Sequence, residues 1–222
     1  MSRLIAAALI LFGSGGVVWA QGAATISAPK DIAKAASAQI GDYWHYDSRD
    51  DITGHVVQID YIVTDVTPTT VAVRAQVEGR AGPPGSMTYD SAWSVIRRDP
   101  WRFLPSDGTG ILQRLVVGAS WSFEGDSINL ANHRSRRRSL TSKIIGREAL
   151  TTKAGTFDTY RIETSWSARD TWDPTLRFEY TQTTWYVPQV NHWVKRTYTF
   201  RTDGLVRERS TVTLTAWGHA QK

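Results

Sequence analysis

The chain has 222 residues, of which 41% are hydrophobic and 21% are charged, and its formal net charge is +5 at pH 7. This length fits one domain or two small ones, and it is sufficient to bury a core without covalent cross-links. The sequence contains no cysteine, which argues against a disulfide-dense extracellular module and against a lipid-modified N-terminal cysteine.

Residues 1–20 have the organisation of a secretory signal peptide. Arg3 gives a short positive start, an apolar run from Leu4 to Phe12 follows, and small residues, Val18 and Ala20, precede the expected cut. These three features are typical of export signals. The alternative is a retained anchor, although the run is short and followed by glycines. We expect cleavage after Ala20, a periplasmic mature chain and no transmembrane segment after cleavage.

Residues 21–39 are predicted to form a disordered leader and a short helix. The first part of this segment is small and polar. Over 29–40, a proline lies near the start and good helix formers follow, with Ile32, Ala36 and Ile40 at helical spacing. We therefore expect a helix here and an antiparallel β domain over 40–218.

The first half of this domain shows period-two alternation of apolar and polar residues. Two such runs, 57–64 and 71–78, are separated by a short turn at 67–69, which predicts a hairpin. Residues 87–96 form a further strand candidate. The segment 100–110 holds two prolines and two glycines, and we expect it to be irregular.

The second half predicts a longer meander of strands. Asp203-Gly204 lies between two β-patterned runs and is the strongest local hairpin signal in the chain. No segment after Ile40 has convincing helical periodicity. The predicted strands are 140–152, 156–166, 175–187, 192–202 and 205–217.

Clean alternation gives each sheet one apolar face. Another layer, closure of the sheet into a barrel, or a ligand must cover that face. We therefore predict a mostly β fold, with a strongly curved antiparallel sheet forming a half-barrel or open barrel, and one short N-terminal helix. Residues 41–46 and 118–123 share a G-x-x-W-x-aromatic motif. This match either marks two related β units, with candidate halves 40–110 and 117–218, or is a coincidence in a tryptophan-rich chain.

A pattern of turn and aromatic residues extends over roughly residues 117–200. It comprises Gly118, Trp121, Gly146-Arg147-Glu148, Lys153-Ala154-Gly155-Thr156-Phe157-Asp158-Thr159-Tyr160-Arg161-Ile162, Thr184-Trp185-Tyr186-Val187-Pro188 and Val194-Lys195. This pattern resembles that of a broad group of uncharacterised exported bacterial β-proteins, with A-G-T-F and W-Y-x-P motifs. That group is remotely similar to the lipoprotein-carrier and lipid-carrier half-barrels of the bacterial envelope. The resemblance implies a curved sheet with an apolar concave face, and it implies no catalytic residue.

The chain departs from this pattern at two turns. Lys153 stands where the pattern usually has proline, and the stretch 189–193 lacks the usual turn glycine. Asn191 is able to adopt the left-handed conformation that such a turn needs.

Two groups of residues are candidates for ligand binding. Arg134, Arg136 and Arg138 would share one face of an extended strand, where three guanidinium groups suit a phosphate or carboxylate head group. The alternative is a solvated loop. Trp185, Tyr186 and Trp193 form an aromatic cluster near a strand end, and packing alone also explains them. The prediction names these six residues as candidate ligand contacts.

Motifs for catalysis or metal binding are absent from the sequence. Gly118-Ala119-Ser120-Trp121-Ser122 lacks the closing glycine and the helix of a nucleophile elbow, and no phosphate-binding loop is present. The five histidines are scattered without metal-ligand spacing. We expect no metal and no cofactor. Three acidic residues near one loop, Asp170, Asp173 and Glu179, are the candidates for a hydrolase.

The leading hypothesis is an exported, non-enzymatic periplasmic binding or carrier module for an apolar or amphipathic ligand, such as a lipid. Export argues against a nucleic-acid partner despite the positive charge. The first alternative is an envelope protein-protein interaction or assembly factor that uses exposed aromatic side chains and strand edges. The second alternative is a hydrolase that acts on an envelope polymer.

Overall fold

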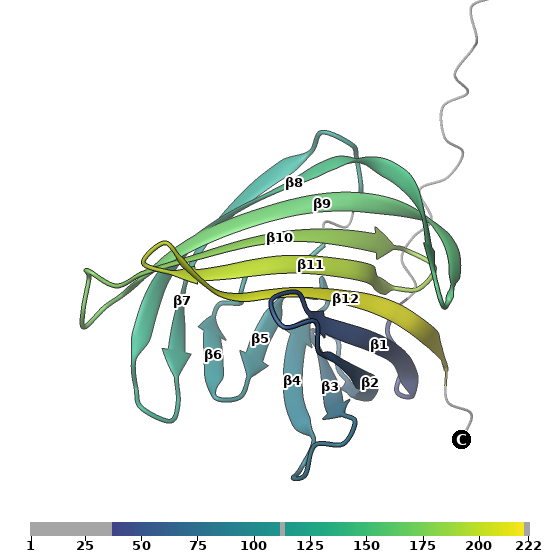
Figure 1. The fold of residues 1–222 in the computed structure, drawn as a ribbon, viewed down its shortest axis with the longest axis horizontal. Helices are drawn as coiled ribbons and strands as arrows, with labels where there is room; N and C mark the ends of the chain where they lie inside the picture. Colours follow the sequence, from purple (N-terminus) through teal and green to yellow (C-terminus); the bar gives the residue numbers. More distant parts are fainter. Residues whose placement is uncertain (1–36, 112–113, 220–222) are drawn as a thin grey trace, which may run out of the picture. The chain divides into compact units, whose positions relative to one another are not determined.

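The computed structural model describes residues 37–111 and 114–219, which form twelve strands. Consecutive strands pair antiparallel, and the first also pairs with the last, so the sheet closes into a barrel (Figure 1). The strands are β1 (Asp42–Asp50), β2 (Val56–Val66), β3 (Thr70–Val77), β4 (Gly85–Asp90), β5 (Val95–Arg98), β6 (Trp101–Leu104), β7 (Ser120–Asn129), β8 (Ser135–Thr152), β9 (Gly155–Asp170), β10 (Arg177–Val187), β11 (His192–Thr202) and β12 (Leu205–His219).

The prediction of a half-barrel or open barrel with a helix was wrong. Closure depends on the pairing of β1 with β12, which runs from Asp42 opposite His219 to Asp50 opposite Ser210. A period-two pattern shows that a strand has one buried face, but it is the same for an open sheet and for a sheet whose ends meet. The meeting of two strands from opposite ends of the domain is a non-local event that no short pattern encodes.

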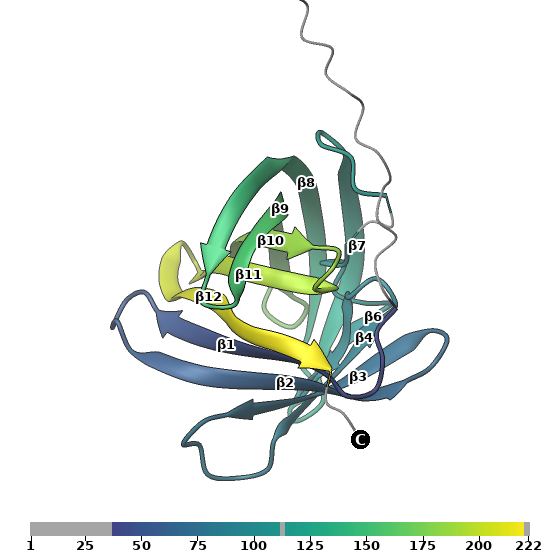
Figure 2. The same ribbon diagram turned by 90° about the vertical axis from the view of Figure 1, so that its right-hand side faces the viewer.

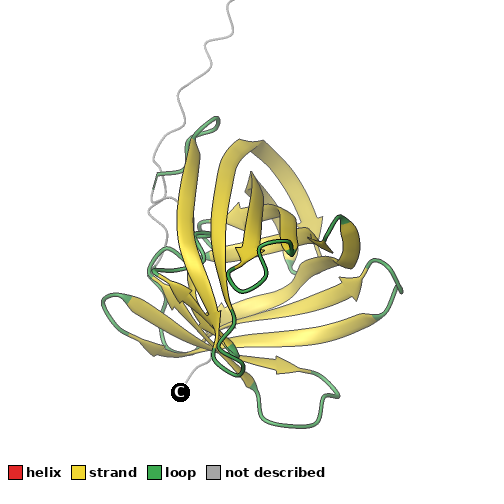
Figure 3. Ribbon diagram, turned by 90° about the vertical axis from the view of Figure 1, so that its left-hand side faces the viewer, coloured by secondary structure: helices red, strands yellow, loops and turns green. Residues whose placement is uncertain are grey.

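Among the described residues, the chain forms strands and loops and no helix (Figure 3). Positions 29–36 of the predicted helix lie outside the described residues, as do the predicted signal peptide and leader. Positions 37–40 are described and are not helical. Within the described ranges, no helix is long and apolar enough to cross a membrane.

The strands differ greatly in length around the barrel. β8 and β9 have 18 and 16 residues, whereas β5 and β6 have four each. In Figure 1, β8 to β12 run side by side across the upper part of the view, and β3 to β6 run steeply beneath them. Register shifts at Ile144/Gly146 and Trp185/Tyr186 lie in the long strands. Such bulges bend and twist a strand, which helps a sheet to curve around its own interior.

The turn chemistry of the second half follows the sequence closely. Asp203 and Gly204 have φ values of 51° and 78°, as a two-residue hairpin turn requires, and this prediction is confirmed. Asn191 has a φ of 53°, which confirms the expected left-handed conformation in the turn between β10 and β11.

Two predictions for the first half need correction. The single strand expected over 87–96 is divided into β4 and β5 by a turn, in which the Asp90 Oδ1 accepts hydrogen bonds from the amides of Ala92 and Ser94, at 2.9 and 2.8 Å. An aspartate that bonds to nearby amides favours a turn over a continuous strand. The segment 100–110, expected to be irregular, contains the short strand β6.

Because each strand is joined to the next, turns alternate between the two ends of the barrel. We call the end with the β2–β3, β4–β5 and β10–β11 turns the packed end. Its interior is filled by a large apolar cluster around Trp44, Tyr46, Trp93 and Leu214. The β10–β11 turn lies toward the middle of the ring of strands in Figure 2, and its residues 190–192 are buried.

Candidate ligand-binding cavity

A cavity of about 580 Å³ occupies the barrel interior, and we call its side of the barrel the cavity end. It is lined by inward-facing side chains from most of the strands. The packed end bounds it on one side, because Tyr89, Trp93 and Trp193 belong both to the apolar cluster and to the cavity wall. The barrel therefore has a filled end and an unfilled end.

One wall of the cavity is a ladder of aromatic rings on β9, β10 and β11. Trp166 and Tyr180 face each other across β9 and β10 and stack at a centroid distance of 5.3 Å. Tyr180 and Tyr198 lie 5.5 Å apart, and Phe178 and Phe200 lie 6.2 Å apart. Cross-strand neighbours on one face of a sheet approach closely enough for such ring contacts. The long strands thus present a continuous aromatic surface to the cavity.

Beside this ladder, the neighbouring strand β8 carries arginines that lie against aromatic rings. The Arg136 guanidinium carbon lies 4.5 Å from the Trp101 ring and 3.7 Å from the Phe178 ring. The Arg138 guanidinium carbon lies 5.0 Å from Phe103 and 4.9 Å from Trp166. Cation-π contacts of this kind fix the orientation of a guanidinium but leave its N–H groups free for other partners.

Two further arginines line the cavity from other strands. Arg98 of β5 lies opposite Trp101 of β6. Arg196 of β11 stacks over Trp193 at 3.6 Å, and its Nε donates to Thr184 Oγ1 at 3.3 Å. Among the residues that the structure describes, the cavity wall therefore contains four arginines and two carboxylates, those of Asp107 and Glu208.

The two carboxylates are already engaged by their own neighbours. Asp107 Oδ1 accepts hydrogen bonds from the Val95 amide at 2.9 Å and the Thr109 amide at 3.0 Å. Glu208 Oε1 accepts a hydrogen bond from the Tyr198 hydroxyl at 2.6 Å. Within the described residues, none of the four cavity arginines has an ion-pair partner within 4.0 Å.

Burial changes the protonation equilibria of several of these groups. Burial lowers the pKa of Arg138, and the charge of Asp107 acts in the opposite direction. Burial also lowers the pKa of Arg136, whose guanidinium is less deeply buried. Loss of solvent raises the pKa of the Tyr198 hydroxyl to about 12, with its hydrogen bond to Glu208 acting in the same direction. The tyrosines of the cavity are therefore neutral donors at neutral pH.

The arginine run separates into two kinds of residue. Arg136 and Arg138 lie on β8 and line the cavity, so the face shared by these two is as predicted. Arg134 lies before the strand, with its Nε 3.2 Å from Asp170 Oδ2, and does not line the cavity. The run is thus a turn that enters a strand, and only its strand part reaches the interior.

The predicted aromatic cluster is also divided. Trp193 lines the cavity. Tyr186 packs with Ile144 and Ile162 in a separate apolar cluster. Trp185 alternates with the inward-facing Thr184 and Tyr186, and Lys195 lies 4.9 Å from its ring. Trp185, Tyr186 and Trp193 therefore lie in three different surroundings, and the register of β10 and β11 shifts between Trp185 and Tyr186.

The three carboxylates considered for a hydrolase do not share a cleft. Asp170 is buried, and its Oδ1 accepts hydrogen bonds from the amides of Trp172 and Asp173, at 3.0 and 3.2 Å. Asp173 Oδ1 accepts from the Thr175 hydroxyl at 2.5 Å. Glu179 is exposed on β10, between the inward-facing Phe178 and Tyr180. Asp170 and Asp173 therefore serve the β9–β10 turn.

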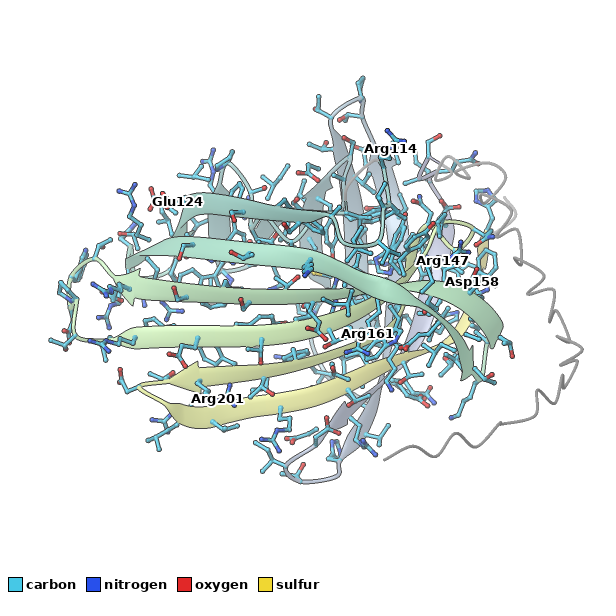
Figure 4. The ribbon with its side chains drawn as sticks, turned by 90° about the horizontal axis from the view of Figure 1, so that it is seen from above. Arg114, Glu124, Arg147, Asp158, Arg161 and Arg201 are labelled. Carbon is cyan, nitrogen blue, oxygen red and sulfur yellow. The ribbon has the colours of Figure 1, made fainter. Side chains whose placement is uncertain are left out.

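A second hollow, of about 610 Å³, lies against the outer surface of β8 to β12. Its side chains are mainly hydroxyls, such as Thr141, Ser165, Thr181 and Thr199. Figure 4 views the barrel from above, where Arg147 and Asp158 lie close together and form an ion pair. This hollow lacks the aromatic walls and buried charges of the interior, so we assign the candidate site to the interior cavity.

Sequence reasoning missed several cavity residues. Arg98, Arg196, Trp166 and Phe178 were not among the predicted contacts, although Trp166 and Phe178 belong to strands with clear alternation. The sequence signal that was available is the period-two alternation of a strand: Trp166 and Phe178 share a face with apolar neighbours two positions away. Which strands face each other across the interior was not available from the sequence.

Comparison with known proteins supports the fold. The chain is similar to a candidate lipoprotein from Parabacteroides distasonis, with a TM-score of 0.53 and 14% identity over 85% of this chain and 100% of that chain. For a candidate exported protein with a YmcC-like fold from Bacteroides fragilis, the TM-score is 0.45 and the identity is 13%, over 84% of this chain and 99% of that chain. For the hypothetical lipoprotein YmcC from Escherichia coli, the TM-score is 0.49 and the identity is 11%, over 81% of this chain and 86% of that chain.

At such identities the first of these likenesses shows the fold alone. The fold of the first structure agrees with the remote resemblance noted in the sequence. No protein-family model matches the chain, and a search of curated proteins finds no match. The class that the fold and cavity define is therefore a closed antiparallel barrel with a partly unfilled interior.

Proposed function

We propose that this protein is an exported, non-enzymatic binding or carrier module that holds an apolar or amphipathic small molecule inside its barrel. The observation that carries this proposal is the cavity of about 580 Å³, whose wall is largely aromatic. Antiparallel barrels of this kind enclose either packed side chains or a ligand. Here one end is packed and the other is not.

The size of the cavity supports a small ligand. Ligand pockets in proteins typically measure roughly 300–1,000 Å³, with mostly apolar walls and a few polar groups. The interior lies within that range, and its wall combines aromatic rings with polar side chains that include four arginines. A single acyl chain or a compact ring system suits this space.

The proposed location is the periplasm, after cleavage behind Ala20. The sequence pattern of residues 1–20 supports export. The similar structures are themselves described as lipoproteins or as an exported protein. A soluble carrier in that compartment would shield an apolar molecule from water, which is favourable in proportion to the apolar area that it covers.

The proposal is tested by native mass spectrometry and lipid extraction of residues 21–222 purified gently from the periplasm. We expect one co-purifying apolar or amphipathic molecule per chain. Binding of the neutral fluorophore N-phenyl-1-naphthylamine then provides a titration. A chain that carries no extractable molecule and binds no fluorophore would contradict the proposal.

A matched pair of variants locates the binding. Ala168 lines the cavity and is buried, whereas its neighbour Ser167 is exposed on the outer face. Ala168→Phe should reduce fluorophore affinity at least about tenfold by filling the cavity. Ser167→Phe should leave the affinity unchanged, because its side chain points away from the interior. Equal effects of the two variants would place the binding elsewhere.

The second candidate is an envelope protein-interaction module. Trp172 and Leu205 are 68% and 60% exposed, in the β9–β10 turn and at the start of β12. Contiguous exposed apolar patches often mark contact surfaces, and the β9–β10 and β11–β12 turns lie at the same end of the barrel. Closure of the barrel weakens this candidate. The hypothesis relied partly on free strand edges, and in the closed barrel both edge strands are paired. Specific capture of one envelope protein, abolished by Trp172→Ser, would favour it over the carrier.

A further inference from the structure

The cavity has more hydrogen-bond donors than the described residues satisfy. Three buried donor atoms in its wall have no partner there: Arg136 Nε, Arg138 Nη1 and Trp193 Nε1. No buried acceptor atom of a described side chain in this wall is unpaired. Because buried polar groups are nearly always hydrogen-bonded, such a wall is suited to a molecule that supplies acceptors.

Arg138 is the most demanding of these groups. It is 6% exposed, and its contacts with Phe103 and Trp166 hold the guanidinium plane without accepting a hydrogen bond from its edge. Burying a charge without a partner is costly, whereas a charge paired by a well-placed anion is tolerated. The position of this side chain therefore favours a bound anion.

The protein's own carboxylates do not meet this demand. Asp107 accepts hydrogen bonds from the Val95 and Thr109 amides, and Glu208 accepts from Tyr198. Four arginines and two carboxylates leave the cavity wall with an excess of two positive charges. A doubly charged acidic group would balance that excess, and a singly charged one would halve it.

We infer that the ligand of this cavity carries an acidic group, a carboxylate or a phosphate, that is bound by Arg138 and Arg136. This inference rests on the proposed function and adds the chemical class of the ligand. The apolar part of the ligand lies against the rings of Tyr61, Tyr89 and Trp193, on the side of the cavity next to the packed end.

The form of the guanidinium supports this assignment. Its planar array of N–H groups matches the oxygens of a carboxylate or phosphate, and charge-assisted pairs are roughly twice as strong as neutral ones. Arg136 and Arg138 each lie between two rings, so little side-chain entropy remains to be lost on binding. Arg134 is excluded from this role because it pairs with Asp170.

Three probes with the same tail separate the contribution of the acidic group from that of the apolar chain. Dodecanol, dodecanoate and dodecyl phosphate are titrated, below their aggregation concentrations, into residues 21–222 by displacement of N-phenyl-1-naphthylamine. We expect at least one acid to bind roughly 10- to 150-fold more tightly than dodecanol, which is the range for hydrogen bonds to charged groups. The tighter of the two acids identifies the head group.

Variants then assign the preference to Arg138. Arg138→Met should remove most of the preference for the acid over dodecanol, since only Arg136 of the proposed pair remains, and it should leave dodecanol binding unchanged or stronger. Arg137→Met is the control, because Arg137 is exposed on the other face of the same strand. Displacement of the fluorophore by dodecanol shows at the same time that the Arg138→Met barrel is folded.

The outcomes distinguish this inference from the proposed function. Equal affinity for all three probes would overturn the acidic ligand and leave the carrier intact. A preference for acids that is unchanged in Arg138→Met would overturn the assignment to Arg138, whatever the effect of Arg137→Met. Failure of every probe to bind would overturn both.

Discussion

The two ends of the barrel interior solve the same problem in different ways. At the packed end, Tyr46 donates a hydrogen bond to the Trp193 carbonyl at 2.8 Å and contacts His192 Nδ1 at 2.6 Å. The Trp44 indole donates to the Val190 carbonyl at 3.0 Å. At the cavity end, Arg136 and Arg138 lack such partners among the described residues.

This difference separates a structural polar network from a binding surface. Because Tyr46 donates its single hydroxyl proton to the Trp193 carbonyl, His192 is the donor in their contact, which places its proton on Nδ1. At the packed end, the Tyr46 hydroxyl, His192 Nδ1 and the Trp44 indole N–H are therefore satisfied by groups of the protein itself. The cavity end keeps charged donors that only another molecule satisfies. Substitutions at the packed end should therefore lower the free energy of unfolding, and removal of a cavity arginine should raise it.

The largest expected effect is the loss of stability on truncating the packed end. Trp44→Ala removes a ring that stacks on His192 at 4.4 Å and lies 5.5 Å from Trp93. We expect the free energy of unfolding to fall by about 3–5 kcal/mol, as in other large-to-small core substitutions. Urea denaturation followed by circular dichroism measures it. The control, Trp217→Ala, removes an exposed ring, and a similar loss there would show that the packed end is not the main source of stability.

Removing one hydroxyl from the same network should cost less. Tyr46→Phe keeps the ring but leaves His192 Nδ1 and the Trp193 carbonyl without their partner. We expect a loss of about 1–3 kcal/mol in the free energy of unfolding, the usual cost of an unsatisfied buried group. The matched substitution Tyr43→Phe alters a less buried tyrosine of the same strand. If Tyr46→Phe is neutral, the network does not satisfy these groups as described.

At the cavity end, a substitution should increase the free energy of unfolding instead of decreasing it. Without ligand, Arg138→Met should raise the free energy of unfolding by about 1–2 kcal/mol, because the removed cost of burying the charge exceeds the lost ring contacts. Chemical denaturation of ligand-free protein measures this change, with Arg137→Met as a control that should stay within about 0.5 kcal/mol of the native chain. A clear destabilisation by Arg138→Met would mean that this arginine holds the barrel together.

The pH dependence of stability should report the packed end. Burial lowers the pKa of His192 well below its ordinary value, and the charge of Arg196 acts in the same direction. The unfolded chain therefore takes up a proton near pH 6.5, and the folded chain does not. Stability from this group is complete above that pH and falls, as pH decreases below it, by up to about 1.4 kcal/mol per pH unit.

Replacement of this histidine tests the assignment. His192→Asn retains a side-chain N–H donor near the position of Nδ1, so the dependence below pH 6.5 should become shallower. His55→Asn serves as a control, because His55 is exposed. Urea denaturation at several pH values measures both. An unchanged slope in His192→Asn would assign the acid sensitivity to other groups.

How much the sequence revealed also differs between local and non-local features. Turns such as Asp203-Gly204 were predictable because their chemistry is local. The inward positions of Arg136 and Arg138 followed from period-two alternation once residues 135–152 were extended. Closure of the barrel was not predictable, because it depends on β1 meeting β12.

The composition of the cavity was partly hidden for the same reason. Arg98 and Arg196 are almost one hundred positions apart in sequence and share the cavity only because the barrel closes. Trp185 and Tyr186 are adjacent in sequence, so alternation places them on opposite faces of β10, and Tyr186 packs with Ile144 and Ile162. Alternation indicates which face a residue takes, but not which residues lie across the interior.

One measurement tests the central claim most directly: the free energy of unfolding of the native chain and of Arg138→Met, without ligand and with saturating dodecanoate or dodecyl phosphate, whichever binds more tightly. The account predicts that the variant is the more stable protein without ligand and the less stable one with it, because the native chain gains more stability from the bound acid than the variant does. A variant that is less stable under both conditions would contradict the account and would make Arg138 a structural residue.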